Sequence, residues 1–489
     1  MRCPLFQGRF SRYPRRSSGR CREVARCVRI GRCRVHQQCQ PVETDAGTEQ
    51  GSKQPATASA IVTHGAGHPA APKESHGNGH GAAIVDRRAE AEGGNWRVQQ
   101  YTNQPGLANV MASCFLIFIA VLLVRHPRYD NWDAFAYVAV ALRDAGMPAD
   151  QIHGATFKIM QDFLPPAYWD LLTGHGSVDP EFRQAVATNA SAFMEQLPFY
   201  SVKPVYPALM AASWGAGAGM IASAMAIGSA AYFGFGVLVY VWFRRWMQPM
   251  IAFAIMALMM LNPYLVAVGR TISPDMLSAL AIALAAFVMI EHRRLALVSA
   301  AILLLAILIR PENIIYAGLF LVYMGYRGDI RLSWIMVLLV GVAAIYLIDT
   351  QASGNYGWKT LFEYTFVNKS VAPAEEAHHN ILFYVEAYLG RIDLILFGSS
   401  VELPIFALVT FGALCLKSRT PAFWTDPYVH LVLICIVLAF ARIAILPQNL
   451  GRALLAVYML LTIAFVQACC DLMAQVTPRH STPGASVNY

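Results

Sequence analysis

Two carboxylates close together in the sequence, Asp130 and Asp133, are the residues of this chain best suited to acid–base chemistry. They stand in Tyr129-Asp130-Asn131-Trp132-Asp133, directly after a long apolar segment. A carboxylate that is partly desolvated beside aromatic residues could accept a proton from a hydroxyl group or hold a divalent cation. The alternative is structural, because both aspartates are also good residues for the first turn of a helix.

A second group of candidate residues is cationic. Arginine presents a planar fork that matches a phosphate group and lysine acts as a point charge, so several of them on one face would suit a phosphate or pyrophosphate. Taken singly, an arginine near a helix end often only extends to lipid headgroups. The four candidates near the ends of apolar segments are Lys203, Arg270, Arg310 and Arg452. Asp275 follows Ser273-Pro274 and either opens a helix or pairs with Arg270.

Metal binding has little support in the sequence. Cys21, Cys27, Cys33 and Cys39 recur every sixth residue, whereas zinc ligands usually come in pairs two to four residues apart. His378 and His379 are neighbours, so in a helix they would point in different directions, although this acidic and aromatic segment could hold an acceptor. We therefore assign no metal ligands from the sequence. A divalent cation bound by the two aspartates remains the alternative.

The elements that must position these residues are membrane helices. The chain has 489 residues, of which 56% are hydrophobic and 14% charged, and its mean hydropathy is +0.42. A membrane span needs roughly 20 apolar residues. Ten segments approach that length, near 107–124, 220–243, 249–268, 275–291, 295–309, 312–325, 333–349, 403–416, 427–446 and 453–470. We therefore predict an all-α, multi-pass membrane protein, and the composition excludes a cytosolic enzyme.

The net charge of +8 does not indicate a nucleic-acid partner, because the first forty residues hold nearly all of the excess. Residues 1–100 have no apolar periodicity, and we expect them to be disordered; a start codon near Met111 is an alternative reading. Residues 101–470 form the predicted membrane domain, and residues 471–489 the tail.

Charges between the apolar segments predict the orientation of the chain. With a cytoplasmic N-terminus, the inner loops carry Arg244-Arg245, His292-Arg293-Arg294, Arg327 with Arg331, and Lys417 with Arg419, as the positive-inside rule requires. Both termini are then cytoplasmic, and the long segments 125–203 and 350–402 lie outside. This count depends on a break at Arg310-Pro311-Glu312, because residues 295–325 are too long for one crossing and short for two.

Two further helices are predicted beside the spans. From Asp133 to Asp144, apolar residues recur at intervals of three and four residues, which is typical of an amphipathic helix on the membrane face. After Lys203-Pro204, residues 205–214 are too short to span, and a glycine-rich stretch follows them. This pattern predicts a juxtamembrane helix and a flexible break.

Several short motifs occur along this topology in a fixed order. They are Asp133-Ala134-Phe135-Ala136-Tyr137, Lys203-Pro204-Val205-Tyr206-Pro207, Ser273-Pro274-Asp275, Arg310-Pro311, and Arg452 with Tyr458. In this order, residues 107–470 resemble the GT-C class of membrane glycosyltransferases, which includes lipid A aminoarabinose transferases and protein O-mannosyltransferases. One position departs from the pattern: Ala134 replaces an acidic residue, so a site with two carboxylates would have to recruit Asp130.

The resemblance implies transfer of a sugar from a polyprenyl phosphate donor to a lipid, glycan or protein acceptor on the outer face of the membrane. It implies Asp133 as the catalytic base, helped by Asp130, and Trp132 and Tyr137 as rings that stack on the sugar. The residues it implies for the donor phosphate are Lys203, Arg270, Arg310 and Arg452, with Tyr206 and Asp275 as further substrate contacts. The composition suggests a bacterial inner membrane. A transporter or flippase for a lipid-linked or anionic solute is the alternative.

Overall fold

The computed structural model describes residues 105–176, 179–354, 356, 358–366, 381–390, 402–417, 421–445 and 451–476. Every element of secondary structure within these ranges is a helix, as the sequence predicts. The predicted disordered N-terminus, the histidines His378 and His379 and most of the C-terminal tail lie outside the described residues.

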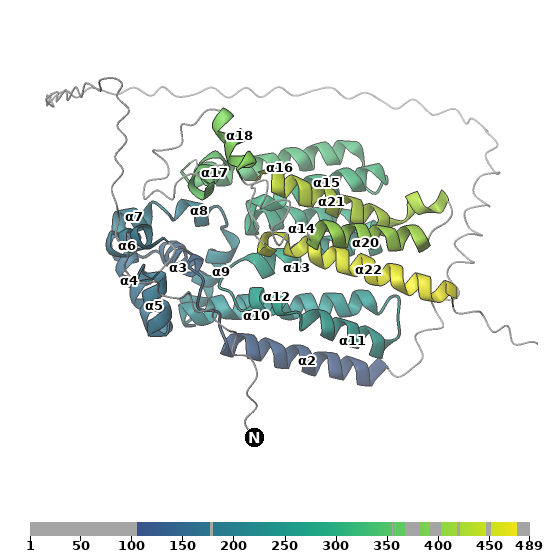
Figure 1. The fold of residues 1–489 in the computed structure, drawn as a ribbon, viewed down its shortest axis with the longest axis horizontal. Helices are drawn as coiled ribbons and strands as arrows, with labels where there is room; N and C mark the ends of the chain where they lie inside the picture. Colours follow the sequence, from purple (N-terminus) through teal and green to yellow (C-terminus); the bar gives the residue numbers. More distant parts are fainter. Residues whose placement is uncertain are drawn as a thin grey trace, which may run out of the picture. The chain divides into compact units, whose positions relative to one another are not determined.

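Long helices that run side by side form one part of the structure (Figure 1). Helix α10 (Met220–Phe243) packs against α2 (Pro105–Arg125) and α13 (Asp275–Glu291), and α13 also packs against α22 (Leu455–Val476). The remaining helices of this bundle are α11 (Pro249–Met260), α12 (Pro263–Gly269), α14 (Ala296–Ile309), α15 (Ile314–Tyr326), α16 (Leu332–Ala352), α20 (Glu402–Lys417) and α21 (Pro427–Ile445).

Four helices, α2, α10, α16 and α22, are long and apolar enough to cross a membrane. The pair α11 and α12 would make a fifth span if it counts as one segment, although it is bent by 69°. The other predicted spans include three shorter helices: α13 has 17 residues, α14 has 14 and α15 has 13. At 1.5 Å per residue these reach roughly 20 to 26 Å, less than the ~30 Å of the hydrocarbon layer. The predicted number of ten spans is therefore not confirmed.

Two proline-containing breaks shape the bundle. The predicted break at Arg310 is confirmed: α14 ends at Ile309, a 3₁₀ turn η3 (Pro311–Asn313) follows, and α15 then begins. The segment predicted as one span over 249–268 is divided, because the Asn262 side chain caps α12 by accepting from the backbone amides of Tyr264 and Leu265. Proline cannot donate the helical hydrogen bond that would continue either helix.

Seven short helices gather at one end of the bundle, and we call this part the cap (Figure 1). They are α3 (Asp133–Asp144), α4 (Ala149–Phe163), α5 (Pro166–Leu172), α6 (Pro180–Thr188), α7 (Ala190–Met194), α8 (Pro198–Ser201) and α9 (Val205–Gly215). The predicted helix after Lys203 is confirmed as α9, and the break after it contains Gly217 with φ +93°.

The prediction that residues 133–144 lie on the membrane face is wrong. Residues 134–142 of α3 are all buried, because α4 and α9 pack against this helix. Between the predicted apolar residues Phe135, Val138 and Leu142 stand small alanines, which let neighbouring helices approach on the other sides as well. The helix that begins at Asp133 is thus fixed at the centre of the cap.

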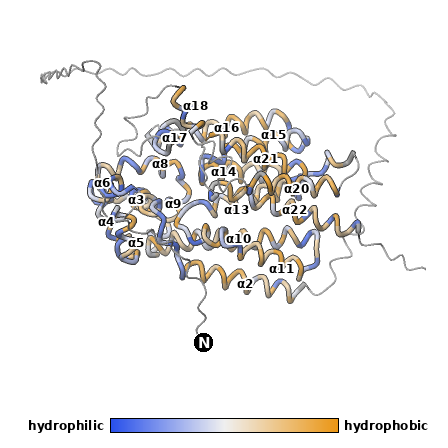
Figure 2. The backbone as a smooth tube through the Cα atoms, viewed as in Figure 1, coloured by the Kyte–Doolittle hydropathy of each residue, from blue (hydrophilic) through white to orange (hydrophobic). Residues whose placement is uncertain are grey.

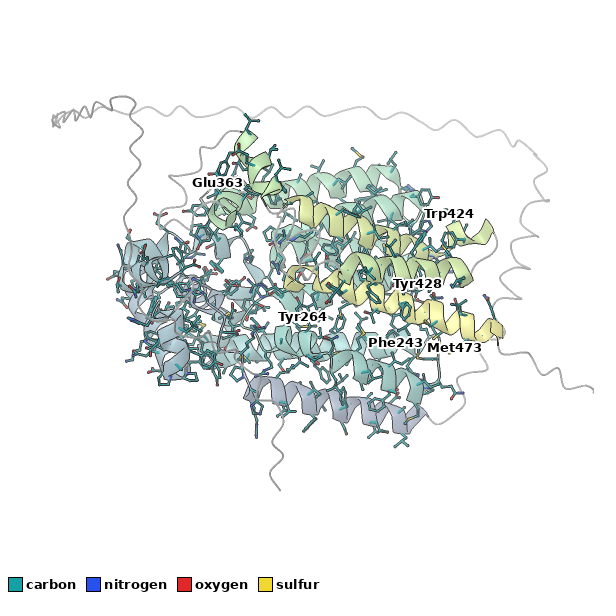
Figure 3. All side chains as sticks on the ribbon, in the orientation of Figure 1. Phe243, Tyr264, Glu363, Trp424, Tyr428 and Met473 are labelled. Atoms are coloured by element: carbon teal, nitrogen blue, oxygen red, sulfur yellow. The ribbon has the colours of Figure 1, made fainter. Side chains whose placement is uncertain are left out.

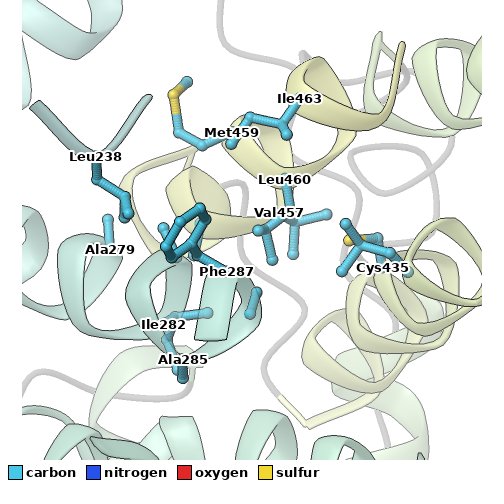
Figure 4. Close-up of a cluster of buried hydrophobic side chains, with 14 of the residues drawn as sticks. Leu238, Ala279, Ile282, Ala285, Phe287, Cys435, Val457, Met459, Leu460 and Ile463 are labelled. Atoms are coloured by element: carbon cyan, nitrogen blue, oxygen red, sulfur yellow. The ribbon is translucent and has the colours of Figure 1, made fainter. Parts of the chain in front are cut away.

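A continuous apolar core holds the bundle together. Figure 4 shows part of it, where Leu238 of α10, Ala279 and Phe287 of α13, and Leu460 of α22 lie among other buried side chains. The colours of Figure 2 follow this division: hydrophobic residues dominate the long helices, and hydrophilic residues concentrate in the cap and at helix ends. Small residues such as Ala279 allow the helices to pack closely.

Polar contacts also join the helix ends that lie far from the cap. The indole of Trp242 donates to the Tyr428 hydroxyl (2.9 Å), and that hydroxyl donates to Glu291 (2.6 Å). Figure 3 shows Tyr428, Phe243 and Met473 at this end of the bundle. The ends of α10 and α13 and the start of α21 therefore meet, so α10 and α13 run in the same direction and α21 runs in the opposite one.

Candidate functional site

A cavity of about 540 Å³ opens where the cap meets the bundle. Trp132, Asp133 and Lys203 line it from the cap side. Residues at the near ends of the bundle helices line the other side, among them Arg310, Glu312, Arg442 and Arg452. The volume is in the range of small-molecule binding sites.

Asp133 lies at the start of α3 with both carboxylate oxygens bound. Its Oδ1 accepts a hydrogen bond from the Tyr200 hydroxyl (2.9 Å), and its Oδ2 pairs with Nη1 of Arg452 (2.7 Å), which lies in the 3₁₀ turn η6 (Gly451–Leu454). Burial opposes the negative charge, but Arg452 and Lys203 outweigh it and hold the pKa of this carboxyl below its usual value. Asp133 is therefore ionised at neutral pH.

Arg310 continues this line of charges into the bundle. Its guanidinium pairs with Asp275, at the start of α13, and with Glu312, whose Oε1 lies 3.1 Å from Nη2. Arg452 also approaches Asp275 at 4.0 Å. The two arginines and their three carboxylates thus alternate across the site. Of the two roles expected for Asp275, pairing with Arg270 is wrong, because Asp275 binds Arg310 instead.

Lys203 faces the cavity from above two tyrosine rings. Its Nζ lies 5.2 Å from the ring centroid of Tyr200 and 5.7 Å from that of Tyr137, and in the part of the chain that the structure describes no carboxylate lies within ion-pair distance of it. Burial, together with the nearby Arg310, lowers the pKa of Lys203 to about 8, although Glu312 acts in the opposite sense. A cation held without a carboxylate partner is well placed to meet an anionic ligand.

Two of the predicted site residues lie elsewhere. The guanidinium of Arg270 donates to the backbone carbonyls of His126 and Pro127 and does not line the cavity. Asp130 is exposed and pairs with Arg128 at 2.5 Å. The structure therefore does not bring Asp130 and Asp133 together as a site with two carboxylates, because each has its own arginine partner.

Of the aromatic residues predicted for the site, one lines the cavity and two do not. Trp132 lines the cavity, with one ring face stacked on Phe135 (4.9 Å between centroids) and Arg183 5.7 Å from its ring centroid. Tyr137 and Tyr206 are buried, pack edge to face against each other and do not line the cavity. Tyr137 therefore supports Lys203 from below, and neither tyrosine lines the cavity, although the resemblance implies both as substrate contacts.

Three residues of the site were not found as candidates from the sequence. Tyr200 binds Asp133, Glu312 binds Arg310, and Arg442 lines the cavity from α21. Arg442 is only 9% exposed, and its Nε and Nη1 atoms have no hydrogen-bond partner among the described residues. An arginine within the apolar run 427–446 was a signal in the sequence, because charges inside such segments commonly mark functional sites.

The described residues offer little for a metal ion. Within the described ranges, no group of three or more His, Cys, Asp or Glu side chains is placed to hold one. Both oxygens of Asp133 are bound by Tyr200 and Arg452. Of the acidic and histidine residues in segment 350–402, Glu363 lies on α17 (Trp358–Phe366) and Glu386 on α18 (Ile381–Leu389). The others, Glu375, Glu376, His378 and His379, lie outside the described residues.

No family model, no curated protein and no solved structure matches the chain.

Proposed function

We propose that this chain is an integral membrane glycosyltransferase that moves a sugar from a polyprenyl phosphate to a lipid, glycan or protein acceptor. The observation that carries the proposal is the meeting of Asp133 with Lys203, Arg310 and Arg452 around one cavity, although these residues are far apart in the sequence. A carboxylate that faces cations suits a reaction in which an acceptor loses a proton while a phosphate departs.

The charges of the site fit a phosphodiester donor. We call seven residues the charged cluster: four cations, Lys203, Arg310, Arg442 and Arg452, and three carboxylates, Asp133, Asp275 and Glu312. The cluster thus has one positive charge in excess, and a sugar phosphodiester has one negative charge. After transfer, Asp133 would hold a proton and the released phosphate monoester would approach two negative charges at pH 7. Cluster and ligand therefore stay balanced in both states.

The proposed reaction is a single displacement. The acceptor oxygen attacks the anomeric carbon and forms the new glycosidic bond, while its proton passes to Asp133. The bond between the anomeric carbon and the phosphate oxygen breaks, and its electron pair stays on the phosphate, where Lys203 and Arg452 stabilise the charge. One displacement inverts the configuration at the anomeric carbon.

The other surfaces of the cavity fit the remaining parts of such a donor. Trp132 and Tyr364 present aromatic rings for the sugar, and Ile314, Ile315 and Ile445 present apolar surface for the first units of the lipid. We place the cavity on the outer side of the membrane, because the basic inner-loop clusters follow helix ends that lie far from the cap. The bacterial inner membrane is part of the same proposal.

Transfer of label from purified protein tests the proposal. The full chain in detergent is mixed with radiolabelled polyprenyl-phosphate sugars and with candidate acceptors, and label that leaves the lipid is counted. Asp133→Asn should reduce transfer by at least about a hundredfold, because general base catalysis contributes roughly 10² to 10⁴.

Asp130→Asn is the matched control, since it makes the same change three residues away on a side chain that does not line the cavity. It should leave transfer nearly unchanged. Equal losses in the two variants would remove Asp133 from the mechanism. If the wild-type protein binds the donor but releases no sugar, and in sealed liposomes moves the donor across the bilayer, the chain is a transporter or flippase.

A further inference from the structure

Arg442 is a buried cation whose position has no explanation within the described residues. It lies near the end of α21, is 91% buried, and keeps Nε and Nη1 without hydrogen-bond partners there. Glu312 is the carboxylate whose charge acts on it most. However, Glu312 is bound by Arg310 through Nε (3.4 Å) and Nη2 (3.1 Å), so it does not satisfy Arg442.

A buried guanidinium without hydrogen-bond partners is unfavourable unless a ligand supplies those partners. A buried charge that lacks partners destabilises a protein, because nothing replaces the hydration that it loses. Arg442 borders the main cavity and also a small adjoining chamber of about 20 Å³, which Asp275 and Asn313 line as well. Its side chain therefore lies where an anion in the cavity could reach it.

We propose that Arg442 binds the phosphate of the lipid donor from the bundle side, opposite Lys203 on the cap. This inference rests on the proposed function for the identity of the donor, and it adds a binding residue from α21 that the sequence motifs do not include. The ligand would then bridge the cap and the bundle, with its phosphate shared by Lys203 and Arg442. These are the two cluster cations that have no carboxylate at ion-pair distance among the described residues. Arg310 would keep its two carboxylate partners, Asp275 and Glu312, while the donor binds.

Binding of a short-chain prenyl monophosphate to the full-length protein in detergent tests this role without any transfer step. Arg442→Gln should weaken binding by about ten- to a hundredfold, as expected for the loss of hydrogen bonds to a charged group. Arg442→Lys, which keeps the charge, should bind more tightly than Arg442→Gln. Arg143→Gln, on an exposed cap arginine that pairs with Asp144, should bind as the wild type does.

A second measurement separates ligand binding from a structural role. Without ligand, Arg442→Gln should unfold at a temperature no lower than the wild type, because the substitution removes a buried charge that lacks partners.

Two further probes show which part of the donor Arg442 contacts: inorganic phosphate, and the prenyl alcohol of the same chain length. If Arg442→Gln also weakens the binding of inorganic phosphate, Arg442 contacts the phosphate itself. If the variant weakens the binding of the alcohol, Arg442 shapes the lipid groove, and this result contradicts the proposal.

The outcomes distinguish this inference from the proposed function. If wild-type protein binds prenyl phosphate and Arg442→Gln binds it within about twofold of the same affinity, the role of Arg442 is wrong while the donor site stands. If Gln and Lys variants lose binding equally and both unfold at lower temperature, Arg442 acts through packing. If the wild type does not bind prenyl phosphate at all, the proposed donor fails together with this inference.

Discussion

The ion pair between Asp133 and Arg452 joins the proposed base to an arginine that is proposed to bind the donor phosphate. While the 2.7 Å contact persists, Arg452 competes with any proton for the carboxylate. Arrival of a phosphate would give Arg452 a second anionic partner and loosen its hold on Asp133. Donor binding would in this way prepare Asp133 to accept the proton of the acceptor.

Tyr200→Phe tests the positioning of Asp133. The substitution removes the hydroxyl that donates to Oδ1 but keeps the ring beneath Lys203. We expect kcat to fall by about tenfold or more and the KM for the donor to change little, because hydrogen bonds to charged groups contribute roughly 1.5 to 3 kcal/mol. Tyr137→Phe is the control, and a matching fall in kcat there would show that the effect does not come from the hydrogen bond to Asp133.

The pH dependence of donor binding tests Lys203. Because the pKa of Lys203 is lowered to about 8, its ammonium loses the proton at a lower pH than an ordinary lysine does. The KM for the donor should therefore rise as pH increases through about 8. Lys203→Arg should remove this rise, since arginine stays charged throughout. An unchanged rise in that variant would assign the titration to another group.

Residue types alone predict part of this site. The sequence indicated Asp133, Lys203, Arg310 and Arg452, which the structure brings to one cavity. It could not separate them from Arg270, because Arg310 and Arg270 both follow apolar segments. The difference is tertiary: the turn after α12 directs Arg270 to two backbone carbonyls, while the break before η3 directs Arg310 to Asp275 and Glu312.

At the scale of elements, the cap depends on a close approach between α6 and the turn that contains Gly174. Gly174 has φ +102°, and an added Cβ would lie 2.7 Å from the backbone oxygen of Pro180. Gly176 also has a positive φ, +88°, but an added Cβ there would meet nothing within 4 Å. Substitution at Gly176 therefore tests backbone strain alone, whereas substitution at Gly174 tests backbone strain together with steric overlap.

Gly174→Ala should destabilise the protein by more than Gly176→Ala. We expect about 1 to 2 kcal/mol for Gly176→Ala from its backbone conformation alone, and at least about 1 kcal/mol more for Gly174→Ala because backbone atoms must move. Thermal unfolding of the purified variants measures the difference. Equal melting temperatures would mean that α6 shifts freely, and the cap would then be less tightly packed than the structure shows.

The elements themselves were predicted unevenly. Proline beside a charged pair identified the break at Arg310, because both features disfavour a continuous helix inside a membrane. The burial of α3 was missed, since its three- and four-residue spacing is typical of a helix with one exposed face. The alanines on its other faces allow packing all round, and only the positions of α4 and α9 decide that they are covered.

At the scale of the whole chain, the cavity and two basic loop clusters lie at opposite ends of the bundle. The cavity lies at the cap end, and the basic clusters Arg244-Arg245 and His292–Arg294 follow α10 and α13 at the other end. Hydropathy located the apolar segments, but only four or five of the described helices are long and apolar enough to span a membrane, so the count of ten is not confirmed. The count depends on helix length and bending, and a hydropathy pattern does not contain either quantity.

Labelling of single cysteines tests the orientation of these two ends. In a variant whose native cysteines are replaced, Ala145→Cys at the end of α3 should react with a membrane-impermeant maleimide in intact cells. Arg294→Cys should react only after the membrane is permeabilised. Both side chains are exposed, so a difference reports sidedness. The reverse pattern would place the cavity on the cytoplasmic side and contradict a donor site on the outer face.

The central claim is that the cavity breaks the bond between a sugar and a lipid phosphate. The most direct measurement follows a doubly labelled donor, with one isotope in the sugar and another in the lipid, in sealed liposomes that contain the full-length protein and acceptor. The account predicts that the sugar label moves to the acceptor while the lipid label stays in the membrane, and that Asp133→Asn stops this separation. If both labels instead cross the bilayer together and never separate, the chain is a transporter, and Asp133 does not act as a base.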